Sequence, residues 1–232
     1  MRQSAHNTKK GGIMGKYIAI IADIKQSRAS GDRKSMQEKL MSVLDITNNK
    51  YRDVIASKFY ISSGDAFQGL LRSGENIMDI IITMELALYP LKLRLGIGIG
   101  TIDTAIYEDN SNLVDGEAYH MARQCLEEVK ENENKNERVI TSYKIAKHGS
   151  ELPLINTLFS LVSIIKGGWS ESQVNVIKAY IENGCNQKNT AEYLGKNQST
   201  ISYSLKGSQF YSLSSAFDVL SSSIEKERVS YE

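Results

Sequence analysis

The chain has 232 residues, of which 41% are apolar and 24% are charged, and its formal net charge is +1. These values are ordinary for a globular protein with a buried core. They exclude a wholly disordered chain, which requires low hydrophobicity and a high net charge. A near-neutral chain does not bind nucleic acid through overall basicity, so any such binding must come from a local surface. The length accommodates one large domain or two small ones.

The cysteine content excludes a disulfide scaffold, because Cys125 and Cys185 are the only two cysteines. Neither has a histidine at zinc-ligand spacing, and together these features indicate a reducing, cytoplasmic compartment. No apolar stretch reaches the ~20 residues that a bilayer requires, so we expect no membrane span. Residues 1–14 lack the apolar run of a signal peptide. We expect a disordered lead there, with Met1 or Met14 as the translation start.

The predicted elements follow one another in a βαββαβ order. Residues 16–22 form a continuous β-branched apolar run, typical of a buried central strand. Residues 32–50 have helical apolar spacing with Asp32 as N-cap, and 58–72 read as two strands joined by a tight turn. The next elements are a helix at 75–88 closed by Pro90, an alternating strand at 92–100, a helix at 115–131, a charged loop at 131–137 and a last strand at 138–141. This order predicts an α+β, ferredoxin-like domain.

Beyond residue 150 no strand pattern remains, and the chain reads as helical. We place a domain boundary near His148. The predicted parts are a lead at 1–14, a sheet domain at 15–148 and a helical domain at 149–232. The predicted helices of the last part lie at 151–165, 170–183, 187–194, 198–206 and 212–227.

Two aspartates follow predicted strands. Asp23 comes directly after the first strand, and Asp65 lies in the hairpin turn. The first strand of a ferredoxin-like sheet lies beside the hairpin, so the two carboxylates would share one edge. Like charges that close favour a bound cation, and oxygen ligands suit Mg²⁺ or Mn²⁺, which also bind phosphates. The alternative is that both aspartates are turn residues that cap nearby amides.

Three segments resemble known catalytic domains. Ala22-Asp23-Ile24, SGDAFQGLL at 63–71 and KLRLGIGIG at 92–100 occur in that order. They resemble the class III nucleotidyl cyclases and, more distantly, the GGDEF diguanylate cyclases. With the helical C-terminal part, the chain resembles the SatD family of small prokaryotic proteins. The resemblance implies that Asp23, Asp65 and the carbonyl of Ile24 bind metal.

The resemblance also implies a catalytic arginine, with departures around it. In DGEAYHMAR at 115–123, Arg123 matches the arginine that stabilises the cyclase transition state. Tyr119 stands where the cyclases have asparagine, and Ile61 replaces their adenine-reading lysine. These departures place cyclase activity in doubt more than nucleotide binding. The alternative for Arg123 is a solvated or ion-paired side chain on a helix surface.

Glycines are the candidate nucleotide contacts. They are Gly64 in the hairpin turn and Gly96 and Gly98, which share one face of the strand at 92–100. A strand face without side chains lets another group approach closely. That group is either a purine or a packed helix, and the sequence leaves both open.

Residues 187–206 have the pattern of a helix-turn-helix. A small residue, Ala191, lets two helices approach each other, and Gly195 allows the turn between them. The β-branched Ile201 packs the second helix against the first. Residues 166–232 hold seven Lys or Arg and seven Asp or Glu, which predicts weak non-specific DNA affinity. A dimerisation or protein-contact unit is the alternative. The candidate DNA contacts on the second helix are Gln198, Ser199, Thr200, Ser202, Tyr203 and Lys206.

The leading hypothesis is a cytoplasmic DNA-binding regulator whose cyclase-like domain binds metal and a nucleotide or another phosphate ligand. The alternative is an active metal-dependent nucleotidyl cyclase or nucleotidyltransferase that uses Asp23 and Asp65. A third possibility is an adaptor with a relic domain. The cyclase resemblance implies a homodimer, and the helix at 212–227 is a candidate for its interface.

Overall fold

The computed structural model describes residues 16–25, 33–134 and 141–230. The predicted lead at 1–14, the choice between Met1 and Met14, and the predicted cap Asp32 lie outside these residues.

The described strands form one mixed five-stranded sheet in the order β2-β3-β1-β4-β5. β1 (Tyr17–Ile24) is central and antiparallel to both β3 (Ala66–Leu71) and β4 (Leu93–Gly100). β2 (Ile55–Ser63) pairs with β3, and β5 (Tyr143–Lys147) runs parallel to β4. The first four strands therefore have the ferredoxin-like order, and β5 extends the sheet beyond it.

The last strand lies later in the chain than the sequence predicts. Thr141 precedes the strand, which runs from Tyr143 to Lys147, and residues 138–140 are outside the described part. Tyr143 and Ile145 are buried, and the Tyr143 ring lies 5.4 Å from the ring of Phe159, centroid to centroid. Packing of these side chains places the described strand at Tyr143–Lys147.

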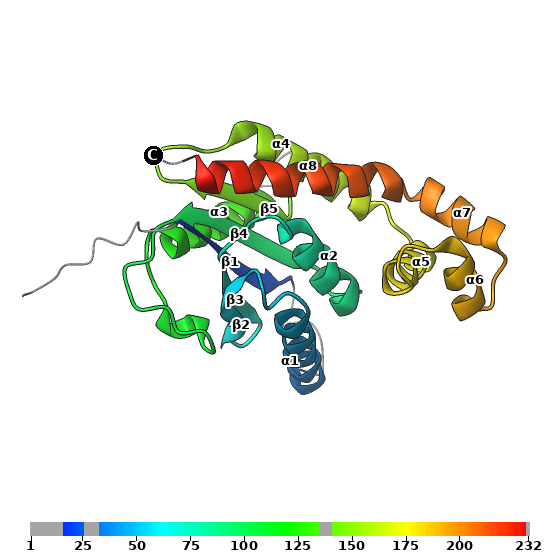
Figure 1. The fold of residues 1–232 in the computed structure, drawn as a ribbon, viewed down its shortest axis with the longest axis horizontal. Helices are drawn as coiled ribbons and strands as arrows, with labels where there is room; N and C mark the ends of the chain where they lie inside the picture. Colours follow the sequence, from blue (N-terminus) through cyan, green and yellow to red (C-terminus); the bar gives the residue numbers. More distant parts are fainter. Residues whose placement is uncertain (1–15, 26–32, 135–140, 231–232) are drawn as a thin grey trace, which may run out of the picture.

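Helices cover both faces of the sheet (Figure 1). α1 (Arg33–Lys50) and α2 (Ile77–Leu88) lie on one face, and α3 (Glu117–Asn134) lies on the other. β1 divides its side chains between the two cores, because successive strand residues point to opposite faces. Ile18 and Ile20 join the core on the α1 and α2 side, while Ala19 joins the core under α3.

Five helices follow the sheet. They are α4 (Pro153–Gly167), α5 (Glu171–Glu182), α6 (Gln187–Leu194), α7 (Gln198–Gly207) and α8 (Phe210–Val229). α4 and α8 pack against the sheet domain, whereas α5, α6 and α7 gather at one end of the molecule (Figure 1). The chain thus leaves the sheet through α4 and returns to it through α8.

The return helix α8 is bonded to the sheet domain. The Glu225 carboxylate accepts a hydrogen bond from the Gly74 backbone N–H at 2.6 Å, and Arg228 donates to the Lys16 carbonyl at 3.1 Å. One face of the helix, with Phe217, Leu220 and Ile224, is buried within the same chain, whereas Val219 and Val229 are exposed. The main apolar face of the helix predicted at 212–227 is therefore occupied internally, and a dimer interface on this helix stays a prediction.

Among the described helices, none combines the length and the apolar character needed to cross a membrane.

Candidate functional site

Asp23 is a buried residue of β1, 7% exposed, and its side chain is held by two cations. Arg94, its register partner on β4, donates from Nε to Oδ1 at 2.7 Å and from Nη2 to Oδ2 at 3.3 Å. Lys130 of α3 places its Nζ 3.2 Å from Oδ2. Such bidentate, charge-assisted hydrogen bonds are among the stronger polar interactions in proteins. Both oxygens of the carboxylate are therefore engaged by residues of the chain itself.

Lys130 is shared between Asp23 and Glu127. Its Nζ lies 2.8 Å from Glu127 Oε1. Burial alone would lower the pKa of the Lys130 ammonium, but hydrogen bonding and charge attraction to Glu127 and Asp23 outweigh burial, and the pKa is raised. Lys130 therefore stays protonated at neutral pH and keeps its charge beside Asp23.

The ion-pair cluster continues through Glu133, near the end of α3. Glu133 lies 3.5 Å from Arg94 Nη1 and also pairs with Lys25, which follows β1. The whole cluster has three acidic and three basic side chains, so its formal charge is zero. The six are Asp23, Glu127, Glu133, Lys25, Arg94 and Lys130. A balanced cluster needs no additional cation to offset the buried carboxylate.

The surroundings of Asp23 and Asp65 bear on the two-metal site that the resemblance implies, which stays a prediction. Asp23 lies opposite Ala66 in the sheet, and Asp65 meets β1 through its backbone, where its carbonyl accepts the Ile24 N–H at 3.2 Å. Within the described ranges, no group of three or more His, Cys, Asp and Glu side chains is placed to hold a metal ion. A metal at Asp23 would compete with Arg94 and Lys130 for the two carboxylate oxygens.

The glycines of β4 lie against a helix. A Cβ built on Gly98 would meet the Ala118 carbonyl oxygen at 2.0 Å, and one on Gly96 would meet the Ala122 carbonyl oxygen at 1.9 Å. The sequence left open whether a purine or a packed helix lies on the glycine face of β4, and in the described structure the helix α3 lies there. The space above Gly96 and Gly98 is therefore filled by backbone and is not free for a purine.

Gly64 differs from the strand glycines. It is exposed in the β2–β3 turn with φ +52°, and a Cβ there would meet nothing within 4 Å. Its role is explained by the turn, because a positive φ favours glycine. Its proposed contact with a nucleotide stays a prediction.

Arg123 and Tyr119 occupy different environments on α3. Arg123 is exposed, and it precedes Lys130 by about two helical turns, or ~10 Å along the axis. The catalytic role of Arg123 stays a prediction. Tyr119 is fully buried, and its hydroxyl has no hydrogen-bond partner among the described residues. Burial and the nearby Asp115 raise the pKa of Tyr119, so its hydroxyl stays protonated.

The segment between β4 and α3 also covers the α3 face of the sheet. Gln68 of β3 and Ser111 exchange two hydrogen bonds, each of 2.8 Å, from each side chain to the other's carbonyl. The Lys58 N–H of β2 donates to the Glu108 carbonyl at 2.8 Å. The face on which the sequence places a ligand is thus filled by the protein's own segment and helix.

The helix-turn-helix pattern forms two helices and a turn where the sequence predicts them. α6 has the predicted bounds, and the Asn186 side chain caps it by accepting the backbone N–H groups of Lys188 and Asn189 at 2.9 and 3.1 Å. Gly195 ends it with φ +61°, and the next backbone N–H donates to the Ala191 carbonyl at 2.9 Å. This hydrogen bond and the positive φ of the glycine form a Schellman motif.

The second helix, α7, has a buried face and an exposed face. Ile201 and Leu205 are fully buried against the other helices. Tyr203 is 80% exposed. Of the other predicted DNA contacts, Ser202 is half-buried, and the exposed ones are Gln198, Ser199, Thr200 and Lys206. The face is therefore available, while its contact with DNA stays a prediction.

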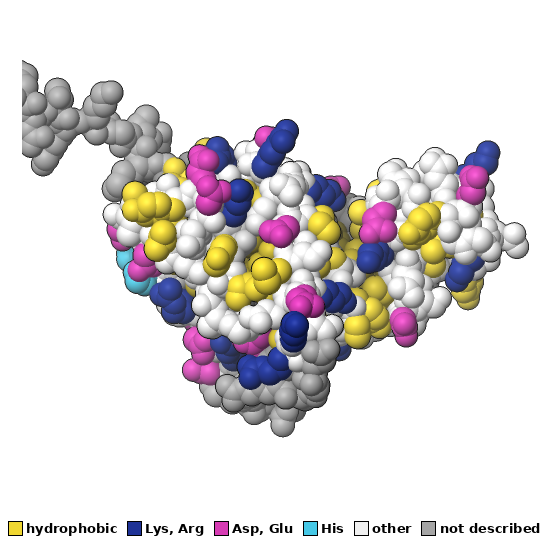
Figure 2. Space-filling view, turned by 90° about the horizontal axis from the view of Figure 1, so that it is seen from below, with side chains coloured by type: hydrophobic (Ala, Val, Ile, Leu, Met, Phe, Trp, Pro, Cys, Tyr) yellow, Lys and Arg dark blue, Asp and Glu magenta, His cyan; other side chains and the backbone are white. Residues whose placement is uncertain are grey.

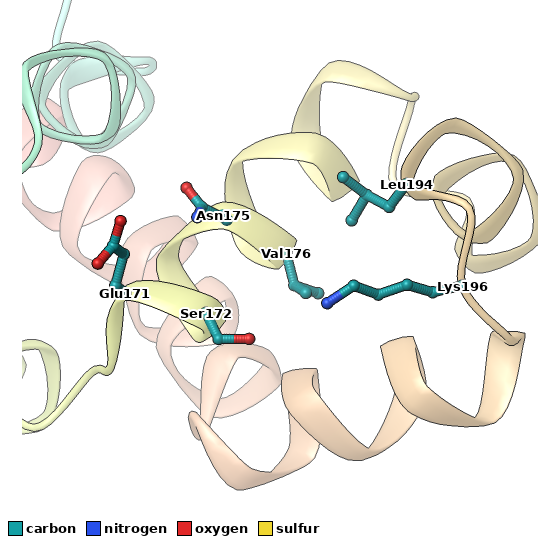
Figure 3. A pocket seen from close by; sticks show the side chains of 6 residues that line it. All are labelled: Glu171, Ser172, Asn175, Val176, Leu194 and Lys196. Carbon is teal, nitrogen blue, oxygen red and sulfur yellow. The ribbon is translucent and has the colours of Figure 1, made fainter.

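The three-helix unit has no surface of a single charge in the view from below (Figure 2). Lys, Arg, Asp and Glu side chains are interspersed over it. An open hollow of about 400 Å³ separates α5 from the α6–α7 turn, and Lys196 extends across it towards Val176 (Figure 3). Glu171 and Lys196 give the hollow one charge of each sign.

Sequence reasoning missed the two cations that contact Asp23, Arg94 and Lys130. Arg94 shares a strand face with Gly96 and Gly98, and its position opposite Asp23 could be derived from strand order and alternation. Lys130 gave no such signal, because its distance from Asp23 depends on how α3 lies over the sheet.

The geometry defines a class of protein: an α+β domain with a mixed sheet, extended by helices that include a helix-turn-helix pair. The SatD family model matches residues 17–213. The chain therefore belongs to the SatD family, as its motifs predict.

Solved structures show distant similarity to cyclases. A bacterial light-regulated adenylyl cyclase has 13% identity and a TM-score of 0.41, covering 56% of this chain and 75% of that one. The guanylate cyclase domain of RhGC from Catenaria anguillulae in complex with GTP has 14% identity and a TM-score of 0.36, covering 49% and 73%. The active GGEEF domain of a diguanylate cyclase from Vibrio cholerae has 13% identity and a TM-score of 0.38, covering 57% and 83%. A search among curated proteins finds no match.

Proposed function

We propose that this SatD protein is a DNA-binding regulatory protein in which α5, α6 and α7 form the DNA-binding unit and α7 enters the major groove. One observation carries the proposal: α7 buries Ile201 and Leu205 and leaves its polar face exposed beyond a glycine-terminated turn. A recognition helix of this type presents its N-terminal residues to base edges.

The first turn of α7 supplies suitable chemistry. Gln198, Ser199 and Thr200 are exposed there, next to backbone N–H groups at the helix N-terminus. Amide and hydroxyl side chains hydrogen-bond to base edges and phosphates, and helix N-termini favour phosphate oxygens. Tyr203 adds an exposed aromatic ring one turn further on.

The charge of the unit limits its affinity. Lys188, Lys196 and Lys206 are exposed on α6, the turn and α7, and Glu182 and Glu192 are exposed nearby. Neutralising about three phosphates predicts a shallow dependence of affinity on salt, with a slope near −3 in logarithmic units. Specific contacts of α7 must then provide most of the discrimination between sequences.

Selection from a random duplex library, followed by fluorescence anisotropy on the enriched sequence, tests the proposal. Tyr203→Ala and Thr200→Val should weaken binding to the selected sequence. Lys206→Gln should weaken binding to all sequences and reduce the salt slope by about 1. Lys226→Gln, which removes an exposed charge from α8, is the matched control and should bind like the wild type. The proposal fails if no sequence is enriched or if all variants bind equally.

No metal ion enters this proposal. Mg²⁺ or Mn²⁺ at Asp23 and Asp65 would be needed for the alternative, a nucleotidyl cyclase or nucleotidyltransferase. That alternative requires Asp23 to exchange Arg94 and Lys130 for the metal. Incubation with each nucleoside triphosphate and Mn²⁺, followed by chromatography, should give no product.

The homodimer is a separate part of the proposal. Two copies would present two α7 helices to neighbouring half-sites, which doubles the contacts with DNA. The buried apolar face of α8 is occupied internally, so an interface on this helix would use its exposed side, which includes Val219. Sedimentation with and without the selected duplex measures the stoichiometry.

A further inference from the structure

A cavity of about 250 Å³ lies at the junction between the sheet domain and the three-helix unit. Its walls come from the end of α2, the start of β4, the start of β5, the end of α4 and the start of α5. At ~30 Å³ for each water, the volume equals about eight waters, which is close to the lower end for ligand pockets. The cavity thus has room for a small molecule.

Apolar and aromatic side chains form most of the wall. Leu86, Leu93 and Val174 line it together with the rings of Tyr89 and Trp169. A wall of this kind favours an apolar body, because burying apolar surface contributes roughly 25 cal/mol for each Å². Trp169 is the only tryptophan of the chain, so tryptophan fluorescence comes from a residue that lines this cavity.

One end of the cavity holds a closed polar cluster. The Tyr143 hydroxyl donates to Glu85 Oε1 at 2.6 Å, and Lys166 pairs with Glu85 and with the same hydroxyl. The side chains of Glu85 and Lys166 are 14% and 13% exposed. Because Lys166 already neutralises Glu85, the carboxylate is not available to a cationic ligand.

The remaining charged groups of the wall are basic. Lys25 pairs with Glu133, whereas the Lys92 ammonium has no hydrogen bond or ion pair within the described residues. The wall carries three lysines and one glutamate, a formal charge of +2. A ligand with an anionic head group would gain a charge-assisted hydrogen bond from Lys92 without displacing an existing partner.

We infer that this cavity binds a small acid with an apolar body, its carboxylate or phosphate at Lys92 and its body against Trp169.

The cavity is placed to affect the three-helix unit. Gly167 ends α4 at the cavity, and the Trp169 indole N–H donates to the Ser208 carbonyl, between α7 and α8, at 2.8 Å. A ligand that shifts Trp169 would shift this contact and change the population of orientations of α7. This regulatory consequence rests on the proposed DNA binding, whereas ligand binding itself does not.

Titration of the full chain with small acids, followed by Trp169 fluorescence, tests the inference. Phenylacetate and phenyl phosphate are the probes, and phenylacetamide is the uncharged match of the first. Both acids share an apolar ring, so their relative affinities show whether the site prefers a carboxylate or a phosphate. Lys92→Gln removes the head-group contact, and Lys226→Gln removes an exposed charge on α8 as the control.

We expect at least one acid to give saturable quenching or a spectral shift, with phenylacetamide about tenfold weaker. Lys92→Gln should weaken that acid about tenfold or more, and Lys226→Gln should leave it unchanged. Absence of a fluorescence change with both acids, or equal affinities for wild type and Lys92→Gln, overturns the inference. The measurement contains no DNA, so failure of DNA binding leaves its outcome intact.

Discussion

Removing the charge of Asp23 should destabilise the sheet domain, because the carboxylate is the common partner of Arg94 and Lys130. Asp23→Asn keeps the shape of the side chain but turns one oxygen into an amide N–H₂ group. Arg94 and Lys130 then lose the carboxylate that both of them contact beneath α3. The variant separates an ion-pair role from a metal-ligand role.

The magnitude follows from burial and from the remaining partners. Breaking a buried ion pair costs about 3–5 kcal/mol, and an exposed pair contributes ~0–1 kcal/mol. Asp23, Arg94 and Lys130 have side chains 10%, 20% and 28% exposed, and the two cations retain Glu133 and Glu127. We therefore expect a loss of about 1–3 kcal/mol, which lowers the Tm by roughly 2–4 °C for each kcal/mol.

Thermal and urea denaturation of the chelator-treated protein measure this loss. Asp53→Asn is the matched control, because the Asp53 side chain is 94% exposed and should change the stability by less than about 0.5 kcal/mol. Asp23→Asn combined with Lys130→Met should cost less than the sum of the two single changes, since the pair interacts directly. Addition of Mn²⁺ should leave the wild-type Tm unchanged.

A metal role for Asp23 would give the opposite pattern. Mn²⁺ would stabilise the wild type as RT ln(1 + [L]/Kd) and would not stabilise Asp23→Asn. If the variant were also as stable as the wild type without metal, the ion pairs would contribute nothing and the reasoning would be refuted.

Three other predictions follow from the packing. Gly98→Ala places its Cβ 2.0 Å from the Ala118 carbonyl oxygen and should lower the free energy of unfolding by about 1–3 kcal/mol in urea. Burial alone would raise the pKa of Glu225, but its bonds to Arg228 and the Gly74 N–H outweigh burial and lower it. Ionised Glu225 therefore stabilises the folded protein at pH values above its ordinary pKa of 4.5, and this stabilisation is lost as the pH falls through its lower pKa in the folded state. The Glu225→Gln variant lacks this group, so acidification should lower its free energy of unfolding less than that of the wild type. Burial and Glu128 raise the pKa of Cys125 to about 12, while Cys185 is exposed, so a thiol reagent should modify Cys185 alone in the folded protein.

Local patterns determined the elements whose side-chain period is clear. The run at 16–22 is buried on both faces as β1, and the alternation at 92–100 is β4, with leucines and isoleucines on one face and Arg94 and glycines on the other. α6 has the predicted bounds, because Asn186 and Gly195 are local signals for its two ends. Such features depend on neighbouring residues, so the sequence alone predicts them.

The partners of Asp23 depended on the tertiary structure. The sequence predicts a metal-binding carboxylate at the end of the first strand, whereas the structure pairs Asp23 with Arg94, which is 71 residues away, and with Lys130 of α3. Strand register brings in the first, and the close approach of α3 over Gly96 and Gly98 brings in the second. The same approach fills the surface that the cyclase resemblance assigns to a nucleotide.

Long-range packing also decided the last strand, the return of α8 and the junction cavity. The last strand lies at Tyr143–Lys147, because Tyr143 packs on Phe159 of α4. The cavity needs wall residues as far apart in the chain as Lys25 and Val174, so no segment alone carries its signal. The periods of helices and strands depend on neighbouring residues and can therefore be read from the sequence. Ion pairs, helix packing and cavities depend on which faces of distant elements meet, and only the tertiary structure determines those contacts.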